Sequence, residues 1–206
     1  MLSSILQDCR VLPVVTAVDV ESTVQLAGAL QRGGMRAIEI TLRSAAALDS
    51  IRAVSARVPG LRVAAGTVTN PAELDQALAA GASLVLSPGA TPQLLRAARE
   101  RAVDFVPGVA TASEVMLGMD HGFEIFKLFP AEAAGGLALL KSLAGPFPHA
   151  RFCPTGGLTP GNFRTYLAQP NVICCGGSWM VGAGLVNNGR WEEIEALARG
   201  AMGDSV

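Results

Sequence analysis

RFCPTGG (residues 151–157) and VICCGGS (residues 172–178) are two short apolar runs that close on a pair of glycines, and a helical pattern at residues 160–167 separates them. Apolar runs of this length that end in turn residues are typical of buried strands. Two strands joined through a helix run parallel, because antiparallel neighbours need only a tight turn. The stretch therefore predicts a strand, a helix and a second strand, with a glycine-rich turn after each strand.

The same alternation extends over the whole chain. Six further apolar runs precede those two: VLPVVTA (11–17), AIEITL (37–42), RVAAGT (62–67), LVLSP (84–88), DFVPGV (104–109) and EIFKLFP (124–130). Helical patterns lie at residues 20–32, 45–58, 71–80, 92–101, 112–119, 136–143, 160–167 and 191–201. Asn70-Pro71, Thr91-Pro92 and Thr159-Pro160 each predict a helix start, with a capping residue before a proline at the first helical position.

Eight strands that alternate with eight helices favour a barrel over an open sheet. A doubly wound sheet usually has about five or six strands and a glycine-rich turn after the first one. Here the glycine-rich turns follow the last two strands, where (β/α)₈ barrels commonly bind phosphate. We predict an α/β fold, a (β/α)₈ TIM barrel formed by residues 1–206 as one domain, with a short helix at residues 1–9 covering the bottom.

The composition excludes several classes of partner. Half of the residues are hydrophobic, 16% are charged and the formal net charge is −1. Interspersed charges of this kind predict no nucleic-acid and no membrane partner, and no apolar stretch reaches the roughly 18 residues of a membrane span. The first ten residues lack the pattern of a secretory signal. We expect a cytoplasmic protein with reduced, buried cysteines, in which the neighbours Cys174 and Cys175 point to opposite faces.

Lys127 is the most unusual residue, because it interrupts the apolar sequence Ile125-Phe126-Lys127-Leu128-Phe129. A lysine that loses its hydration in such a strand favours the neutral amine, which attacks ketones to form a Schiff base. The alternative is a lysine of an edge strand whose ammonium group reaches solvent. Phe129 shares the face of Lys127 and could shield an imine from water.

Glu39 is the candidate proton carrier. It lies between Ile38 and Ile40, where a carboxylate is costly unless it is paired. Schiff-base chemistry needs a group that moves protons between the carbinolamine, the imine and the enamine. A structural ion pair with Arg43 or Lys127 is the alternative, and the two roles are compatible.

Arg43 and Thr67 end the second and third predicted strands, at the face where barrel enzymes build their active sites. The planar guanidinium group of Arg43 suits a substrate carboxylate, and the hydroxyl of Thr67 could add a hydrogen bond. The alternative for Arg43 is an exposed arginine at the start of a loop. His121 and His149 fall at the opposite, bottom face, so we expect neither a metal site nor a cofactor at the top.

Glycine pairs follow the seventh and eighth predicted strands, in Thr155-Gly156-Gly157 and Gly176-Gly177-Ser178. Backbone N–H groups exposed by glycine at a helix N-terminus bind phosphate without a lysine. One pair alone could serve a tight turn. Two pairs at adjacent strand ends predict a phosphate site.

These residues give the chain a close resemblance to the family of 2-keto-3-deoxy-6-phosphogluconate (KDPG) aldolase and 4-hydroxy-2-oxoglutarate (KHG) aldolase. The resemblance spans nearly the whole sequence. The stretches that carry it are EITLR (39–43), AGTV (65–68), SPG (87–89), FVPGV (105–109), KLFPAE (127–132), RFCPTGG (151–157) and GGSW (176–179).

The resemblance implies a class I aldolase without metal or cofactor, in which Lys127 forms the Schiff base and Glu39 transfers protons. Arg43 and Thr67 are then the ligands of the pyruvate carboxylate. The other implied substrate-binding residues are Pro88, Phe129, Thr155, Gly156, Gly157, Gly176, Gly177 and Ser178. A homotrimer of the Entner–Doudoroff pathway is also implied, which cleaves KDPG to pyruvate and glyceraldehyde 3-phosphate.

Three alternatives stay open at the level of sequence. The glycine cradle could also accept 4-hydroxy-2-oxoglutarate, whose carboxylate stands in place of the phosphate and whose cleavage gives pyruvate and glyoxylate. A phosphosugar isomerase or epimerase would share the cradle, but would not need Lys127. A barrel that binds a metabolite without catalysis would need neither Glu39 nor Lys127.

Overall fold

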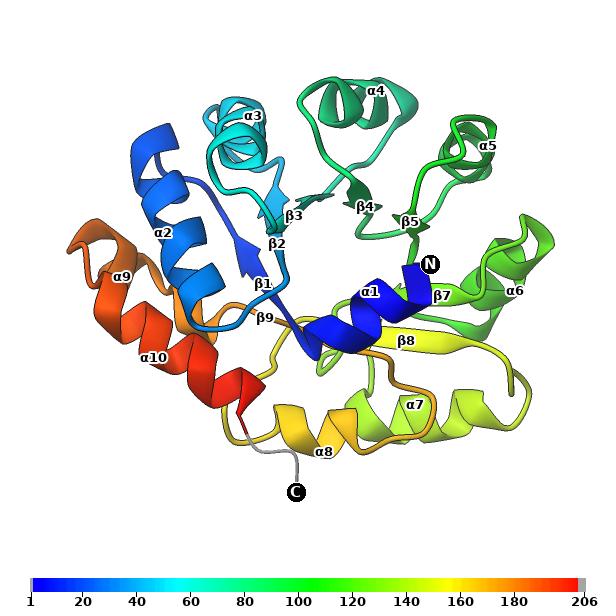
Figure 1. Ribbon diagram of the computed structural model, residues 1–206. Helices are drawn as coiled ribbons and strands as arrows, with labels where there is room; N and C mark the ends of the chain where they lie inside the picture. The colour runs from blue at the N-terminus through cyan, green and yellow to red at the C-terminus, as the bar shows by residue number, and fades with distance from the viewer. Residues whose placement is uncertain (1, 204–206) are drawn as a thin grey trace.

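Parallel strands surrounded by helices make up the chain (Figure 1). The computed structural model describes residues 2–203, without the side chains of Ser4 and Ile5. The strands are β1 (Val11–Val15), β2 (Ala37–Thr41), β3 (Arg62–Gly66), β4 (Leu84–Leu86), β5 (Phe105–Val106), β6 (Gly108–Val109), β7 (Ile125–Leu128), β8 (Arg151–Pro154) and β9 (Cys175–Gly177). The helices are α1 (Leu2–Cys9), α2 (Val20–Arg32), α3 (Ala47–Arg57), α4 (Pro71–Ala79), α5 (Pro92–Glu100), α6 (Ala112–Asp120), α7 (Gly136–Ala144), α8 (Phe163–Leu167), the 3₁₀ helix η1 (Trp179–Val181), α9 (Ala183–Asn187) and α10 (Trp191–Met202).

The predicted alternation of strands and helices is confirmed, but the strands do not form one continuous closed ladder. One sheet has the order β5-β4-β3-β2-β1-β9 and the other has the order β6-β7-β8. Pro107, which has no N–H group to donate, divides the predicted fifth strand into β5 and β6. Within residues 2–203, only the isolated bridges Phe152 to Val172 and Thr155 to Gly176 join β8 to the segment of β9. The closed eight-stranded ladder expected for the barrel is therefore interrupted at two places.

Most helix boundaries follow the sequence signals. The side chains of Asn70 and Thr91 accept hydrogen bonds from the backbone at the starts of α4 and α5, as predicted. The predicted start at Thr159-Pro160 is wrong, because α8 begins only at Phe163. Residues 160–162 form a turn instead, in which the backbone N–H of Thr159 donates to Asn162 Oδ1 at 2.8 Å. The two short helices η1 and α9 have no counterpart in the sequence prediction.

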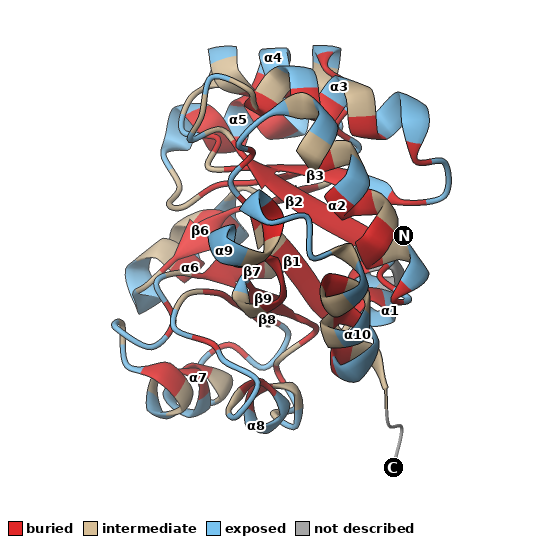
Figure 2. Cartoon of the chain, turned by 90° about the vertical axis from the view of Figure 1, so that its left-hand side faces the viewer, coloured by how far each residue is buried: buried red, intermediate tan, exposed pale blue. Residues whose placement is uncertain are grey.

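Two apolar layers follow from the alternation of side chains along the strands. Figure 2 shows the strands almost wholly buried, whereas the helices bury one face. Ile38 and Ile40 of β2 pack outward in the larger cluster, between the strands and the helices. Ala37 of the same strand points into the barrel, in a smaller cluster with side chains of α1. Glu39 and Thr41, at the same parity as Ala37, therefore face the interior.

Helix α1 crosses the end of the barrel at which the strands begin (Figure 1). Its residues Leu6 and Cys9 pack against the interior cluster that holds Leu12 and Leu84. The prediction of a short helix over the bottom is thus confirmed for Leu2–Cys9, while Met1 lies outside the described residues. None of the helices within residues 2–203 is long and apolar enough to cross a membrane.

The cysteines are buried and unbridged. Cys174 belongs to the interior cluster and Cys175 to the outer cluster, so the prediction that they point to opposite faces is confirmed. Burial raises the pKa of the Cys9 thiol to about 12. Burial also raises the pKa of the Cys175 thiol, and both thiols are packing groups that stay protonated at neutral pH.

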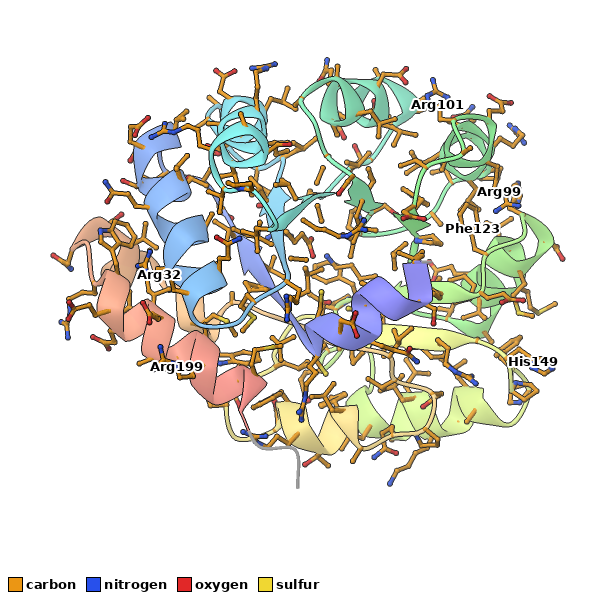
Figure 3. All side chains as sticks on the ribbon, viewed as in Figure 1. Arg32, Arg99, Arg101, Phe123, His149 and Arg199 are labelled. Atoms are coloured by element: carbon orange, nitrogen blue, oxygen red, sulfur yellow. The ribbon has the colours of Figure 1, made fainter. Side chains whose placement is uncertain are left out.

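The last helix joins the C-terminal part of the chain to the first βα unit. Arg32 of α2 and Arg199 of α10 both reach Glu195, at 2.9 Å and 2.6 Å (Figure 3). A Cβ at Gly33 would lie 2.7 Å from the carbonyl oxygen of Glu195, so the glycine lets the two helices approach closely. Exposed ion pairs add little stability, and the close approach is the stronger constraint.

Candidate active site

Lys127 and Glu39 meet inside the barrel. Lys127 Nζ donates to Glu39 Oε1 at 2.7 Å, and the two residues are 3% and 0% exposed. Their strands β7 and β2 belong to different sheets, so the contact crosses the barrel interior. β7 lies between β6 and β8, which makes the alternative of an edge-strand lysine reaching solvent wrong. The predicted pairing of the two residues is present.

Gly66 of β3 makes room for this pair. Gly66 stands opposite Thr41 in the parallel register of β2 and β3. A Cβ added at Gly66 would overlap Oε1 of Glu39, the oxygen that binds Lys127. The close packing of backbone against carboxylate fixes the direction in which Glu39 points. Among the described residues, its second oxygen Oε2 is buried and has no hydrogen-bond partner.

A cavity of about 230 Å³ opens above Lys127 at the ends of the strands. It brings together most of the predicted site, and three further residues that the sequence did not suggest. The lining residues are Val14, Thr16, Arg43, Lys127, Phe129, Thr155, Gly156, Gly157, Leu158, Gly176, Gly177 and Ser178. Glu39 lies beneath this surface, behind Lys127. The ring of Phe129 has its centroid 5.5 Å from Lys127 Nζ.

Arg43 and Thr67 lie together at the rim of the cavity. Arg43 Nε donates to Thr67 Oγ1 at 3.0 Å, while the other guanidinium nitrogens make no hydrogen bond within the described residues. Thr67 has φ of 61°, a left-handed conformation that is unusual for a β-branched residue. Such strain costs about 1–3 kcal/mol and accumulates at functional sites. The strained backbone directs the hydroxyl of Thr67 toward Arg43.

Two predicted substrate-binding positions stay outside the cavity lining. Thr67 reaches the cavity only through Arg43. Pro88 is half-buried and packs against β6, because a Cβ at Gly108 would overlap the backbone of Pro88. Ser87 Oγ also accepts a hydrogen bond from the N–H of Gly108 at 3.1 Å. The structure therefore places Pro88 in the wall that supports β6 and β7.

The glycine-rich loop after β8 and the end of β9 with Ser178 also line the cavity, and we call residues 155–158 and 176–178 together the anion cradle. Gly156 and Gly157 have φ of 100° and 83°, which L side chains rarely adopt. A Cβ at Gly176 would overlap Thr155 Oγ1, so the two segments of the cradle touch each other directly. The sequence placed a helix N-terminus at the first loop, but α8 begins five residues after Leu158 and the loop stands alone.

The carbonyl groups of the first loop are held on the side away from the cavity. Thr155 O and Gly156 O accept hydrogen bonds from the N–H groups of Ala131 and Glu132, at 2.8 Å and 3.1 Å. The C=O and N–H of a trans peptide point in opposite directions. The N–H groups of Gly156 and Gly157 are therefore turned toward the cavity, and within residues 2–203 neither donates to another group. Free N–H groups in a concave loop bind anions.

Metal-binding side chains do not gather here. Over the described part of the chain, no group of three His, Cys, Asp or Glu residues has the arrangement to hold a metal ion. His149 lies at the edge of the molecule, between α7 and β8 (Figure 3). His121 ends α6 and precedes β7, at the bottom face, as predicted.

Comparison with known proteins shows the family. The family model described as KDPG and KHG aldolase matches residues 2–197. The KHG/KDPG aldolase of Escherichia coli (strain K12) is 49% identical over 199 residues, which cover 97% of this chain and 93% of that relative. The chain belongs to the KDPG and KHG aldolase family. The resemblance recognised in the sequence is thereby confirmed, and the chain is an aldolase, which is a lyase. The isomerase and the non-catalytic barrel are not favoured.

Solved structures of KDPG aldolases have the same fold. The Legionella pneumophila KDPG aldolase, captured with pyruvate as a covalent carbinolamine, has a TM-score of 0.95 and 38% identity, with 98% of both chains covered. The Zymomonas mobilis enzyme with 3-phosphoglycerate has a TM-score of 0.92 and 44% identity, covering 98% of this chain and 94% of that one. A KDPG aldolase fold therefore accounts for nearly the whole length of the chain.

Proposed function

We propose that this chain cleaves KDPG to pyruvate and glyceraldehyde 3-phosphate through a Schiff base on Lys127. The observation that carries the proposal is the buried contact of 2.7 Å between Lys127 Nζ and Glu39 Oε1 beneath the cavity. Transfer of one proton across this contact leaves two neutral groups, an amine and a carboxylic acid. The amine is then the nucleophile and the acid the first proton donor.

Lys127 Nζ attacks the C2 ketone of the substrate, and the resulting carbinolamine loses water to give an imine. Glu39 takes the proton of the C4 hydroxyl, and the C3–C4 bond breaks to release the aldehyde and an enamine. Glu39 then returns the proton to C3, and water hydrolyses the pyruvate imine. Oε2 of Glu39 is buried and unpaired within the described residues, which supports its use as the proton-carrying oxygen.

Different residues of the site bind the two charged groups of the substrate, its carboxylate and its phosphate. Arg43 and Thr67 bind the carboxylate beside the keto group, and Phe129 shields the imine from water. The phosphate is bound by the residues of the anion cradle, which are Thr155, Gly156, Gly157, Gly176, Gly177 and Ser178. Pro88 supports β6 from outside the cavity lining. The Zymomonas mobilis aldolase, solved with 3-phosphoglycerate, supports a phosphorylated acid as ligand.

A second substrate and the cellular setting complete the proposal. The Escherichia coli relative is named for both KHG and KDPG, which supports cleavage of 4-hydroxy-2-oxoglutarate to pyruvate and glyoxylate as a further activity. We propose a cytoplasmic homotrimer of the Entner–Doudoroff pathway, in which residues 1–206 act as one domain. The four unbridged cysteines fit a reducing compartment.

Borohydride trapping with pyruvate tests the proposed chemistry. The sequence contains only two lysines, Lys127 and Lys141, so the labelled position is unambiguous. We expect hydride to reduce the imine to a secondary amine, which adds one pyruvyl group per chain at Lys127. Lys141 is exposed on α7 and is the internal control. Labelling of Lys141 alone, or no labelling, would contradict the mechanism and would favour an isomerase or a binding protein.

A further inference from the structure

We propose that Glu132 is a positioning residue that holds the first loop of the anion cradle with its N–H groups toward the substrate. The inference rests on the proposed function, because it takes the cradle as the phosphate site. Glu132 is exposed and does not line the cavity. Its contacts reach the cradle from behind, through both its backbone and its side chain.

The carboxylate of Glu132 is held by donors from the α8 segment. The hydroxyl of Tyr166 donates a short hydrogen bond to Oε1 of Glu132. Asn162 Nδ2 donates to the same oxygen at 3.4 Å and also to the carbonyl oxygen of Gly157 at 3.4 Å. Asn162 Oδ1 accepts the hydrogen bond from the N–H of Thr159. One carboxylate oxygen of Glu132 thus links α8 to the end of the cradle loop at Gly157. We call these contacts of Glu132 with Tyr166 and Asn162 the brace.

The backbone of the same segment turns the loop. The N–H of Glu132 donates to Gly156 O at 3.1 Å, and the N–H of Ala131 donates to Thr155 O at 2.8 Å. With the contact from Asn162, the carbonyl groups of Thr155, Gly156 and Gly157 are all engaged on the outer side. The N–H groups of the same three peptides, which belong to Gly156, Gly157 and Leu158, therefore point inward, where an anion would bind.

Close packing makes this arrangement specific to Glu132. A Cβ at Gly157 would lie 2.6 Å from the Cβ of Glu132, and a Cβ at Gly136 would lie 2.8 Å from the Tyr166 hydroxyl. Tyr166 is 1% exposed. Its burial, with the hydrogen bond to Glu132, raises the pKa of the hydroxyl, which therefore remains a donor throughout the neutral pH range. Both glycines leave space that the bond between Tyr166 and Glu132 requires.

The test compares variants that keep or remove the hydrogen-bond acceptor. Glu132→Gln removes the charge but retains an oxygen that accepts from Tyr166, whereas Glu132→Ala removes both. Tyr166→Phe removes only the donor. Glu192→Ala, an exposed carboxylate on α10, is the matched control. For each protein we would measure KM and kcat for KDPG, the dissociation constant of inorganic phosphate by calorimetry, and the exchange of pyruvate methyl protons in deuterated water.

We expect Glu132→Ala to raise KM for KDPG and the dissociation constant of phosphate by about tenfold, the effect of losing one hydrogen-bonded brace. Tyr166→Phe should move both constants in the same direction, and Glu132→Gln should restore them to within about threefold. Proton exchange of pyruvate, which carries no phosphate, should change least. Glu192→Ala should match the wild type.

Unchanged phosphate binding in Glu132→Ala would overturn the proposal, because Glu132 would then not orient the loop. Equal weakening of phosphate binding in Glu132→Ala and Glu132→Gln would also overturn it, because the effect would then come from the charge and not from the hydrogen bond. If Glu132→Ala does not fold, the comparison of Tyr166→Phe with Glu132→Gln decides the matter in the same way. Phosphate binding separates this inference from the proposed function, because it is measured without turnover. If the wild type binds phosphate, Glu132→Ala weakens that binding and the wild type does not cleave KDPG, only the proposed function is contradicted.

Discussion

Lys127, with Glu39 paired behind it, and the anion cradle line the same cavity, but the pair and the cradle are built in different ways. The pair consists of two side chains that the strands β7 and β2 hold inside the barrel, 3% and 0% exposed. The cradle consists of backbone at the ends of β8 and β9, and hydrogen bonds from Ala131 and Glu132 orient the peptides of its first loop. Changes to the pair should therefore affect kcat and stability, whereas changes to the cradle should affect KM for phosphorylated substrates.

The largest expected effect comes from Lys127→Met. Without an amine no imine forms, so we expect kcat for KDPG to fall by at least about 10⁴-fold. The variant also leaves the carboxylate of Glu39 buried without its partner, which should lower the free energy of unfolding by roughly 3–5 kcal/mol in urea titrations. The double variant Lys127→Met/Glu39→Gln should recover part of that stability but none of the activity. Recovery of activity would show that Lys127 is only structural.

Glu39→Gln should have the next largest effect. The amide still accepts a hydrogen bond from Lys127 but cannot carry a proton, so kcat should fall by about 10²- to 10⁴-fold. Exchange of pyruvate methyl protons with deuterated water measures this step alone, since it needs the enamine but no aldehyde. Normal exchange in the variant would mean that another group carries the proton and that Glu39 serves the ion pair.

The pair could be predicted from the sequence, whereas the brace behind the cradle could not. A charged residue within an apolar strand is conspicuous, and the alternation of side chains along AIEIT places Glu39 inside the barrel with Ala37. Glu132 and Tyr166 carry no such signal. Glu132 lies in a turn and Tyr166 in the short helix α8, and the two residues are 34 positions apart in the sequence. Their role follows from loop geometry, which depends on tertiary contacts.

The fold shows the same division. Apolar runs and proline caps predicted the order and nearly all the boundaries of the elements, because these depend on local preferences. The break of the ladder at Pro107 depends on which groups can donate between strands, and the sequence pattern alone treated residues 104–109 as one strand. Thr16, which lines the cavity, is the second-last residue of the first predicted strand and could have been included by the rule that selected Thr67.

Gly66→Ala tests the pair without changing either of its members. The added Cβ would overlap Glu39 Oε1 and displace the carboxylate from Lys127. A misplacement of about 1 Å in a catalytic group can cost about 10²-fold in rate, and we expect a loss of kcat of that size with little change in KM. Gly200→Ala is the control, because a Cβ at Gly200 within α10 meets no atom within 4 Å. A fall in KM instead of kcat would argue against this geometry.

Arg43→Ala should weaken binding of the substrate carboxylate, which we assign to Arg43 and Thr67. Loss of a charge-assisted hydrogen bond of about 1.5–3 kcal/mol corresponds to an increase in KM for the keto acid of about 10- to 100-fold. Arg52→Ala, an exposed arginine on α3, is the control. Titration of pyruvate in the proton-exchange assay gives the constant directly. An unchanged constant would make Arg43 an exposed loop residue without a substrate contact.

Gly176→Ala should have the smallest effect, and it completes the contrast with Gly66→Ala. The added Cβ would overlap Thr155 Oγ1, a hydroxyl that donates to Cys153 O at 3.3 Å and lines the cavity. Because we propose that two segments share the binding of the phosphate, displacement of one should raise KM for KDPG by only about tenfold, a loss near that of one hydrogen bond. The effect on kcat should be smaller than that of Gly66→Ala, since the chemistry at Lys127 uses none of the cradle's N–H groups. Steady-state kinetics of both variants with KDPG give the two ratios side by side. If Gly176→Ala lowered kcat as strongly as Gly66→Ala, the pair and the cradle would act as one unit, and the division between them would be wrong.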